Sequence, residues 1–274
     1  MDIIRDNNIN MGNYSFSAIT ESVDSLIYYP PQTPDEIFNK LDTNRSKMEL
    51  LVTDNHQTVP IVIVMPTENQ IVSKYIIFSH GNGCDIYGMF DYFKELADGC
   101  NACVIGYDYI GYGLSRINTP TETGCYESID FVVKYVMNIL EIKPENIYLF
   151  GQSLGTGVVV DYVTKNKWKN PIMLISPYKS ICRVVADSSC ISLVSAIDKF
   201  TTYNKLSEVI CPVKIVHGIE DNVINISHAQ AIYKNLPNKI LKPVWFEKGN
   251  HNNILNMITN EHYFDVLNYK KALF

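Results

Sequence analysis

The sequence predicts an α/β fold in which eight strands form one twisted, mostly parallel sheet flanked by helices. Its strand-sized apolar runs are continuous rather than alternating, which indicates strands covered on both faces. These runs alternate with amphipathic stretches of helical length, the pattern of right-handed strand–helix–strand crossovers. The chain has 274 residues, of which 46% are hydrophobic and 19% charged, so it can form one large domain with a sizeable core.

The elements can be placed along the chain in order. The first two apolar runs are spaced as a β-hairpin and cover residues 47–53 and 59–65. Single buried strands are then expected at residues 74–79, 103–108, 146–150, 171–176, 212–217 and 243–246. Amphipathic periodicity predicts helices at residues 89–96, 121–140 and 154–165, and a largely helical C-terminal part at 253–274. Thr121 is the expected N-cap of the second helix, because its hydroxyl can accept a backbone hydrogen bond.

We expect one α/β domain, residues 47–274, preceded by an N-terminal extension, residues 1–46, that packs on its core. The Tyr-Tyr-Pro-Pro sequence at 28–31 favours an extended segment across the surface. The connection at 177–211 is longer than a minimal crossover and too short for a separate domain. We expect a short lid there, beside the functional face; a plain crossover helix with a loop is the alternative.

Composition excludes some classes of partner. The 23 Lys and Arg against 29 Asp and Glu give a net charge of −6, so nothing basic is available to neutralise phosphates, and nucleic acid is not expected. The longest apolar runs are strand-sized, so no integral membrane segment is predicted. The first residues show no basic region followed by an apolar run, the pattern of a secretory signal.

The expected localisation follows from residue usage. The seven cysteines are odd in number and scattered, which fits reduced thiols in a soluble, cytoplasmic protein. The chain is rich in Ile, Asn and Tyr, a bias typical of AT-rich genomes, including those of large DNA viruses. If the genome is viral, packaging in the virion is the alternative localisation.

A Gly-x-Ser-x-Gly motif occupies residues 151–155, directly after an expected strand and before an expected helix. In that context the serine lies on a strained turn that lifts its hydroxyl clear of the sheet. The two glycines leave room for the neighbouring backbone, and the start of the helix directs N–H groups at the same place. We therefore expect Ser153 to be a nucleophile.

A serine hydroxyl needs a base within hydrogen-bond reach. In this architecture the acid follows a late strand and the histidine follows the last strand, which selects Asp221 and His251 among the six histidines and the late carboxylates. Glu220, directly before Asp221, remains the alternative acid. His80 and His217 each precede a glycine at a strand end, and we expect them to shape turns by hydrogen bonds to the backbone.

A developing oxyanion needs backbone donors. One expected donor is the N–H of Leu154, directly after the nucleophile, and the other is the N–H of Asn82. Gly81 and Gly83 allow the loop around Asn82 to bend close to the site. This chemistry requires neither a metal ion nor an organic cofactor, so none is expected.

Together these residues resemble the α/β-hydrolase superfamily. Several motifs are similar to one eukaryotic branch, the α/β-hydrolase-domain family seventeen, whose members remove palmitate from membrane-bound proteins. They are Phe78-Ser-His-Gly-Asn82, Tyr107-Asp-Tyr-Ile-Gly-Tyr-Gly113, Tyr148-Leu-Phe-Gly-Gln-Ser-Leu-Gly-Thr156, Ser176-Pro177 and His217-Gly-Ile-Glu-Asp-Asn-Val-Ile224. The resemblance covers about residues 45–274. It implies an α/β-hydrolase fold, a triad of Ser153, Asp221 and His251, and oxyanion donors at Asn82 and Leu154. The acylated, Cys-rich N-terminus of the membrane-bound members has no counterpart, because the first cysteine here is Cys84.

We therefore expect a serine hydrolase that cleaves carboxylic ester or thioester bonds through an acyl-enzyme, with small-molecule or acylated-protein substrates. Long-chain acyl groups, palmitoyl among them, are in the expected range. A serine peptidase is an alternative on the same fold, although such enzymes usually carry a gating domain. A catalytically idle binding protein is the alternative from another class, and the complete triad disfavours it. The sequence leaves the oligomeric state open.

Overall fold

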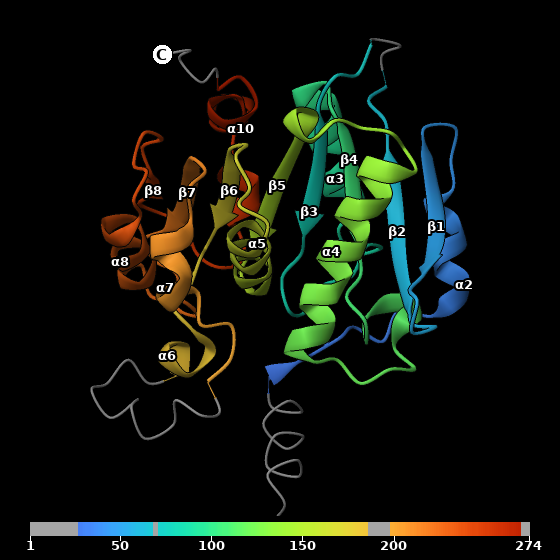
Figure 1. The fold of residues 1–274 in the computed structure, drawn as a ribbon, viewed down its shortest axis with the longest axis horizontal. Helices are drawn as coiled ribbons and strands as arrows, with labels where there is room; N and C mark the ends of the chain where they lie inside the picture. The colour runs from blue at the N-terminus through green and yellow to red at the C-terminus, as the bar shows by residue number, and fades with distance from the viewer. Residues whose placement is uncertain (1–26, 68–70, 186–197, 270–274) are drawn as a thin grey trace, which may run out of the picture.

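The computed structural model describes residues 27–67, 71–185 and 198–269. An eight-stranded sheet lies at its centre, with helices on both faces, so the predicted fold class is confirmed (Figure 1). The strands are β1 (Ser46–Val52), β2 (Thr58–Val64), β3 (Tyr75–Ser79), β4 (Cys103–Tyr107), β5 (Ile147–Gln152), β6 (Ile172–Ile175), β7 (Val213–Gly218) and β8 (Val244–Phe246). The helices are α2 (Asp35–Phe38), α3 (Phe90–Cys100), α4 (Glu122–Asn138), α5 (Leu154–Lys165), α6 (Ile181–Val185), α7 (Thr202–Lys205), α8 (Ser227–Asn235), α9 (Ile254–Met257) and α10 (Asn260–Leu267).

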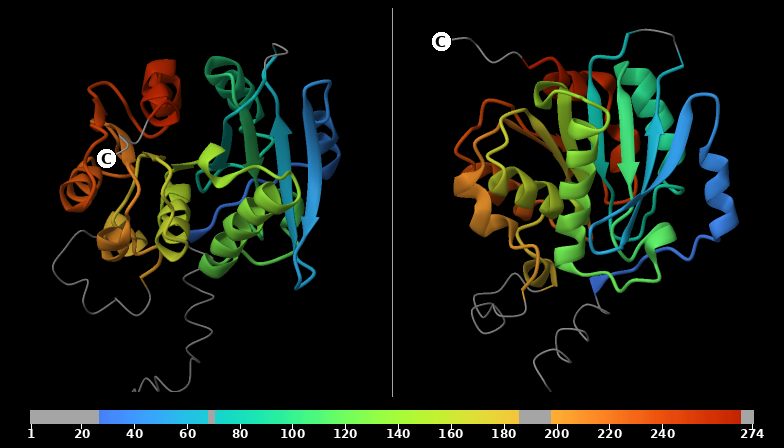
Figure 2. Two further views of the ribbon diagram at one scale, coloured as in Figure 1. Left: turned by 45° about the horizontal axis from the view of Figure 1, so that its top comes forward. Right: turned by 45° about the vertical axis from the view of Figure 1, so that its right-hand side comes forward.

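The strand order is β1-β2-β4-β3-β5-β6-β7-β8. The expected hairpin forms the antiparallel pair β1–β2 at one edge, where Figure 2 shows it beside α2. β2 also pairs antiparallel with β4, and all later neighbours pair parallel. Because the strands β3 to β8 run in one direction, their carboxyl ends share one edge of the sheet. The loops after β3, β5, β7 and β8 therefore meet there.

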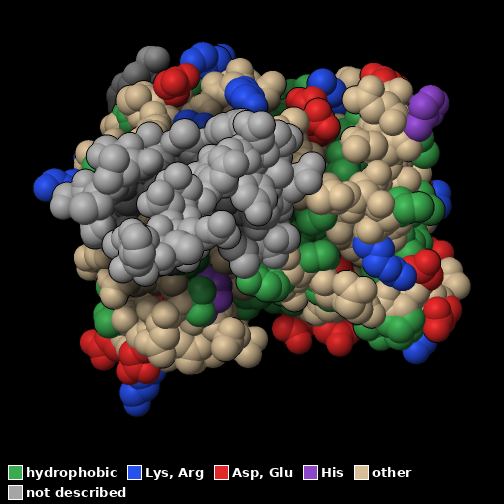
Figure 3. Space-filling view, turned by 90° about the horizontal axis from the view of Figure 1, so that it is seen from below, with side chains coloured by type: hydrophobic (Ala, Val, Ile, Leu, Met, Phe, Trp, Pro, Cys, Tyr) green, Lys and Arg blue, Asp and Glu red, His purple; other side chains and the backbone are tan. Residues whose placement is uncertain are grey.

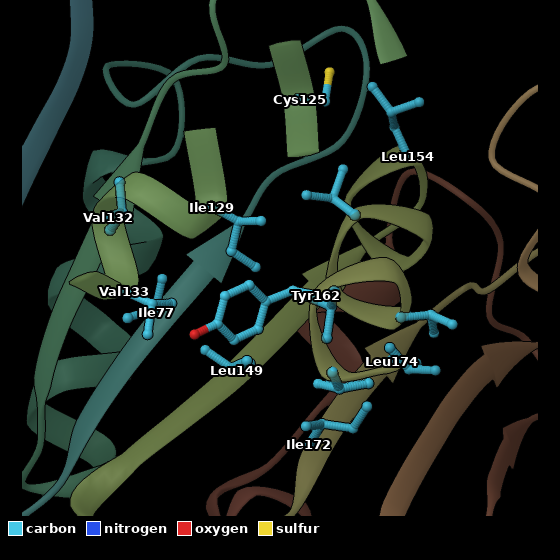
Figure 4. Close-up of a cluster of buried hydrophobic side chains, with 14 of the residues drawn as sticks. Ile77, Cys125, Ile129, Val132, Val133, Leu149, Leu154, Tyr162, Ile172 and Leu174 are labelled. Atoms are coloured by element: carbon cyan, nitrogen blue, oxygen red, sulfur yellow. The ribbon is translucent and has the colours of Figure 1, made fainter. Parts of the chain in front are cut away.

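The sheet separates two hydrophobic cores. In β4, Ile105 faces the core under α4 and α5, while its neighbour Val104 faces the core under α3 and α10. Figure 4 shows the first core, in which Tyr162 of α5 lies between Ile129 of α4 and Leu149 of β5. Strands covered on both faces explain the continuous apolar runs in the sequence. This packing supports the strand ends that carry the site.

Two expectations for the helices are met within the described residues. Thr121 caps α4 as predicted, because its hydroxyl accepts the N–H of Gly124 at 2.9 Å. The C-terminal part is largely helical, and the extended residue Ile258 divides it into α9 and α10. Thr259 then starts α10 with a capping box whose partner is the side chain of His262. This local cap explains why a new helix begins there. Residues 270–274 lie outside the described residues.

The expected lid and the expected N-terminal extension fall only partly within the described residues. The connection 177–211 contains α6 and α7, but residues 186–197 lie outside the described residues, so the lid stays a prediction. The same holds for residues 1–26 of the extension and thus for the domain boundary. Within the described extension, Tyr28 is buried against Phe200. Among the described helices, none combines the length and apolarity needed to cross a membrane.

Candidate active site

Ser153 forms the entire connection between β5 and α5. Its backbone has φ 49° and ψ −118°, a region that residues with a side chain rarely adopt. The N–H of Ser153 donates to the carbonyl of Ile175 in β6 at 2.9 Å, which anchors the turn to the sheet. The predicted strained turn is therefore present, and it places the hydroxyl at the carboxyl edge of the sheet.

The two motif glycines are required by close backbone approach. A Cβ on Gly151 would lie 2.6 Å from the carbonyl oxygen of Gly155. A Cβ on Gly155 would lie 2.1 Å from the carbonyl oxygen of Ser79, at the end of β3. Both contacts are with backbone, which cannot rotate away as a side chain can. The glycines thus allow α5 to start directly against β3.

Gly155→Ala is expected to lower the free energy of unfolding by about 1–3 kcal/mol, because the new methyl group overlaps the backbone of Ser79. Urea denaturation of the variant and the wild type measures this difference. Gly83→Ala is the matched control, since a Cβ there would have no atom within 4 Å. Equal midpoints for the wild type and Gly155→Ala would contradict the close packing of α5 on β3.

The three predicted side chains meet at this edge. The Oγ of Ser153 lies 3.1 Å from Nε2 of His251, and Nδ1 of His251 lies 2.8 Å from Oδ2 of Asp221. Ser153 follows β5, Asp221 follows β7 and His251 follows β8, so three strand ends bring them together. This is the geometry in which an imidazole can take a proton from a serine hydroxyl while a carboxylate holds its other nitrogen.

Of the two candidate acids, Asp221 is the one whose side chain contacts His251. Asp221 is 4% exposed, and its Oδ1 accepts the N–H groups of Val223 at 2.9 Å and Ile224 at 2.7 Å. Burial opposes ionisation of this carboxyl, but hydrogen bonds from His251 and from the Ile224 N–H outweigh it and lower its pKa. Asp221 is therefore ionised at neutral pH. Glu220 is exposed, and only its backbone is engaged, with its N–H donating to Gly249 at 2.9 Å.

His217 shapes the loop that carries Asp221. Its buried Nε2 lies 2.8 Å from the carbonyl oxygen of Ile224, to which it donates, so the loop is closed from within. Burial also lowers the pKa of His217. A neutral imidazole with its proton on Nε2 fits this contact, in agreement with the turn-shaping role expected from the sequence.

Stability is expected to fall as the pH drops below about 6.5, where His217 of the unfolded chain binds a proton that the folded chain resists. Its folded pKa is lowered, so the stabilisation is complete above the unfolded pKa and is lost as the pH falls through the folded pKa. Urea unfolding at pH of about 7.5 and about 5.5 measures the loss. His217→Gln has no titrating ring at this position, so its free energy of unfolding should fall less between the two pH values. An equal fall in the variant would show that other groups cause the pH dependence.

The two expected oxyanion donors both border the serine. Within the described residues, neither the N–H of Leu154 nor that of Asn82 donates to another protein group. The peptide that carries the Asn82 N–H is held at its other end, where the Gly81 carbonyl accepts Nδ1–H of His80 at 2.8 Å. Since C=O and N–H point in opposite directions in a trans peptide, this contact turns the N–H away from the His80 ring.

His80 is itself held rigidly. Its ring is completely buried, and Nε2 lies 3.4 Å from Oδ1 of the equally buried Asp108. The ring packs against Tyr109, with centroids 4.4 Å apart, and the Tyr109 hydroxyl donates to the His80 carbonyl at 2.6 Å. Burial outweighs the opposing hydrogen bond with His80 and raises the pKa of Asp108. His80 thus orients the peptide before Asn82, as expected of a turn-shaping residue.

A cavity of about 450 Å³ opens over the serine, at the end of the molecule that Figure 3 views. Its polar lining includes Asn82, Ser153 and His251. Its apolar wall comes from several segments far apart in the sequence and includes Met89, Ile181, Val184, Val223, Ile224 and Leu255. Sequence reasoning did not identify these residues, because apolar side chains carry no chemical motif. The only available signal was the three-residue spacing of two of them within the expected lid.

The sequence of this chain is similar to those of several known proteins, including one viral and one human protein. Over 253 residues the chain is 51% identical to an alpha/beta hydrolase of Acanthamoeba polyphaga mimivirus, and the match covers 92% of this chain and 95% of the relative. Over 183 residues it is 36% identical to alpha/beta hydrolase domain-containing protein 17C of Homo sapiens, covering 66% of this chain and 54% of the human protein. The match thus spans about half the length of the human relative. No family model matches the sequence.

Among solved structures, the 2,6-dihydroxy-pseudo-oxynicotine hydrolase is similar with a TM-score of 0.63 at 17% sequence identity. The superposition covers 81% of this chain and 68% of that enzyme. At this identity the likeness establishes the shared fold.

Proposed function

The chain belongs to the α/β-hydrolase family, and on that premise we propose that it is a serine hydrolase that cleaves carboxylic esters or thioesters. The observation that carries the proposal is the continuous hydrogen-bond chain from Ser153 through His251 to Asp221. A serine hydroxyl becomes a competent nucleophile when an oriented base lies within hydrogen-bond reach. Its position at the floor of an apolar cavity supports an acyl substrate.

In the proposed first half-reaction, the Oγ of Ser153 attacks the acyl carbonyl while Nε2 of His251 takes its proton. The carbonyl oxygen becomes an oxyanion, which the N–H groups of Asn82 and Leu154 stabilise. The carbon–oxygen or carbon–sulfur bond then breaks, and His251 returns the proton to the leaving alcohol or thiol. The acyl group remains esterified to Ser153.

In the second half-reaction, His251 takes a proton from water, which attacks the acyl-enzyme. The same donors stabilise the second oxyanion, and His251 returns the proton to Ser153 as the free acid departs. Asp221 remains ionised throughout, since its folded pKa is lowered. It keeps the imidazole oriented and stabilises the imidazolium that forms in each half-reaction.

The proposed substrates carry a long acyl chain, as the resemblance to family seventeen implies. The apolar wall supports this, because burying apolar chain surface is favourable by about 25 cal/mol per Å². Met89, Ile181, Val184 and Leu255 supply that surface next to the serine. The leaving group can belong to a small molecule or to an acylated protein.

Hydrolysis of p-nitrophenyl esters from acetyl to palmitoyl tests the proposal. A kcat/KM that rises with chain length is the expected result. A maximum at short chains would replace the long-chain proposal by a small-ester hydrolase. If the protein neither hydrolysed any ester nor was labelled at Ser153 by a fluorophosphonate, the proposal of an enzyme would be overturned. The alternative of a catalytically idle binding protein would then be favoured.

The viral source of one relative bears on localisation. It is compatible with a viral origin of this chain, and we propose packaging in the virion as the alternative to a cytoplasmic enzyme. Mass spectrometry of purified particles and of infected-cell cytosol distinguishes the two. Recovery of the chain from the cytosol alone would reject packaging.

A further inference from the structure

We propose that residues 27–33, here called the strap, act with Tyr112 to position the oxyanion donor by holding the Asn82 side chain. The strap is extended and runs along the carboxyl edge of the sheet toward α2, as the right-hand view in Figure 2 shows. This inference rests on the proposed function, because only the oxyanion of acyl transfer gives the Asn82 N–H its task. It assigns positioning roles and no chemical step.

The Asn82 side chain is held from two directions. Its Oδ1 accepts the hydroxyl of Tyr112 at 2.6 Å and the N–H of Tyr29 at 3.1 Å. Its Nδ2 donates to the carbonyl of Ile27 at 2.5 Å. Both ends of the amide are therefore engaged, by residues 30 to 55 positions away in the sequence. The amide connects the strap to the loop that provides the donor.

The strap is fastened to the same loop at a second point. The hydroxyl of Thr33 donates to Oδ2 of Asp85 at 2.5 Å, and Oδ1 of Asp85 accepts the N–H of Gly88 at 2.8 Å. Within the first fastening, between Ile27 and Tyr29, the ring of Tyr28 is buried against Phe200, with centroids 6.3 Å apart. The strap is thus attached at the start and at the end of residues 82–85.

The loop depends on such support because glycines flank Asn82 on both sides. Glycine loses the most conformational freedom on folding, so Gly81 and Gly83 fix the direction of the intervening peptide poorly. A Cβ on Gly83 would have no atom within 4 Å, so packing does not confine that side of the loop. The Asn82 side chain therefore anchors this peptide from the side opposite to the His80 bond on the Gly81 carbonyl. An oxyanion donor has to lie within about 2.7–3.1 Å of the developing charge.

Tyr112 is a rigid partner for this anchor. It is completely buried, and its ring packs edge-on against Tyr109, with centroids 5.4 Å apart. A second ring, His80, lies 5.6 Å away. Since these neighbours leave the phenol no alternative position, its hydroxyl fixes where Oδ1 of Asn82 lies.

Tyr112→Phe is expected to lower kcat about tenfold with little change in KM, because a small displacement of the donor weakens transition-state binding alone. The matched control is Tyr92→Phe, which removes another hydrogen-bonded hydroxyl, 2.8 Å from that of Tyr263, in a residue that does not line the cavity. The control should keep the wild-type kcat. Asn82→Ala serves as a second variant that removes the whole anchor, with an expected loss of about tenfold to a hundredfold.

The strap is tested through its backbone. Tyr29→Pro removes the backbone N–H that donates to Oδ1 of Asn82. Little packing is lost with the Tyr29 side chain, because Tyr29 is 62% exposed. The matched control, Ser73→Pro, adds the same residue outside the strap, at an exposed position whose N–H donates to no group within the described residues. We expect a several-fold lower kcat for Tyr29→Pro, roughly in the range of Tyr112→Phe, and wild-type kcat for Ser73→Pro.

Affinity for an alkylboronic acid separates positioning from general loss of structure. Its tetrahedral adduct with Ser153 places a charged oxygen in the oxyanion hole. We expect the inhibition constant to rise by the same factor as kcat/KM falls across Tyr112→Phe, Asn82→Ala and Tyr29→Pro. Wild-type values of kcat/KM and of the inhibition constant in all three variants would overturn the strap inference and leave the proposed function standing. No hydrolysis and no fluorophosphonate labelling of the wild type would instead overturn the proposed function.

Discussion

Replacement of Ser153 by alanine is expected to lower kcat for ester hydrolysis by about 10⁴–10⁶-fold, because the members of a triad act as one unit. Without Oγ no acyl-enzyme can form, and the base His251 at 3.1 Å has no hydroxyl to deprotonate. The oxyanion donors and the cavity remain, so a residual rate above that of water is expected.

Single-turnover and steady-state assays with the best p-nitrophenyl ester measure this loss. Ser73→Ala is a suitable control, since Ser73 is an exposed serine outside the helices and strands. Thermal unfolding should show both variants folded like the wild type. A folded Ser153→Ala variant that hydrolyses esters at a rate near that of the wild type would contradict the proposed nucleophile.

The second large effect is expected for Asp221→Asn, which should lower kcat by about 10⁴-fold. The amide keeps the shape of the carboxylate but carries no charge to stabilise the imidazolium. It also presents a donor to Nδ1 of His251, now held by Oδ2 at 2.8 Å, and so favours the wrong tautomer. The loss should fall on kcat, since Asp221 does not line the substrate cavity.

Glu220→Gln is the matched control for this substitution, one residue away on the same loop. Its exposed side chain has no hydrogen bond to the imidazole, so kcat should change by less than about a factor of two. Parallel pH–rate profiles of the two variants make the comparison sharper. If Glu220→Gln proved the more damaging, the assignment of the acid would be wrong.

The fold was accessible to sequence reasoning because its signals are local. Continuous apolar runs marked the strands of the sheet, and the hairpin β1–β2 followed from spacing alone. The largely helical C-terminal part is confirmed within the described residues, but the break at Ile258, after which the capping box of Thr259 begins a new helix, was not predicted. The short helix α2 also escaped, since four residues give no period to detect.

The sequence by itself determined where the strained serine lies and in which order a carboxylate and a histidine follow it. A Gly-x-Ser-x-Gly turn is specified by the steric demands of five consecutive residues, here confirmed by the φ of 49° at Ser153. The order of strands along the chain then placed Asp221 and His251 at the same edge of the sheet. These inferences need only neighbouring residues and the direction of the strands.

Only the tertiary structure shows which of Asp221 and Glu220 contacts His251, because two adjacent residues after a strand carry the same sequence signal and differ only in the direction of their side chains. The loop conformation, closed by His217 on Ile224, turns Asp221 inward. The cavity wall and the hold of the strap on Asn82 were likewise decided by packing, since their members come from segments far apart in the chain. Local sterics act over a few residues, whereas such contacts exist only once the whole sheet has brought its loops together.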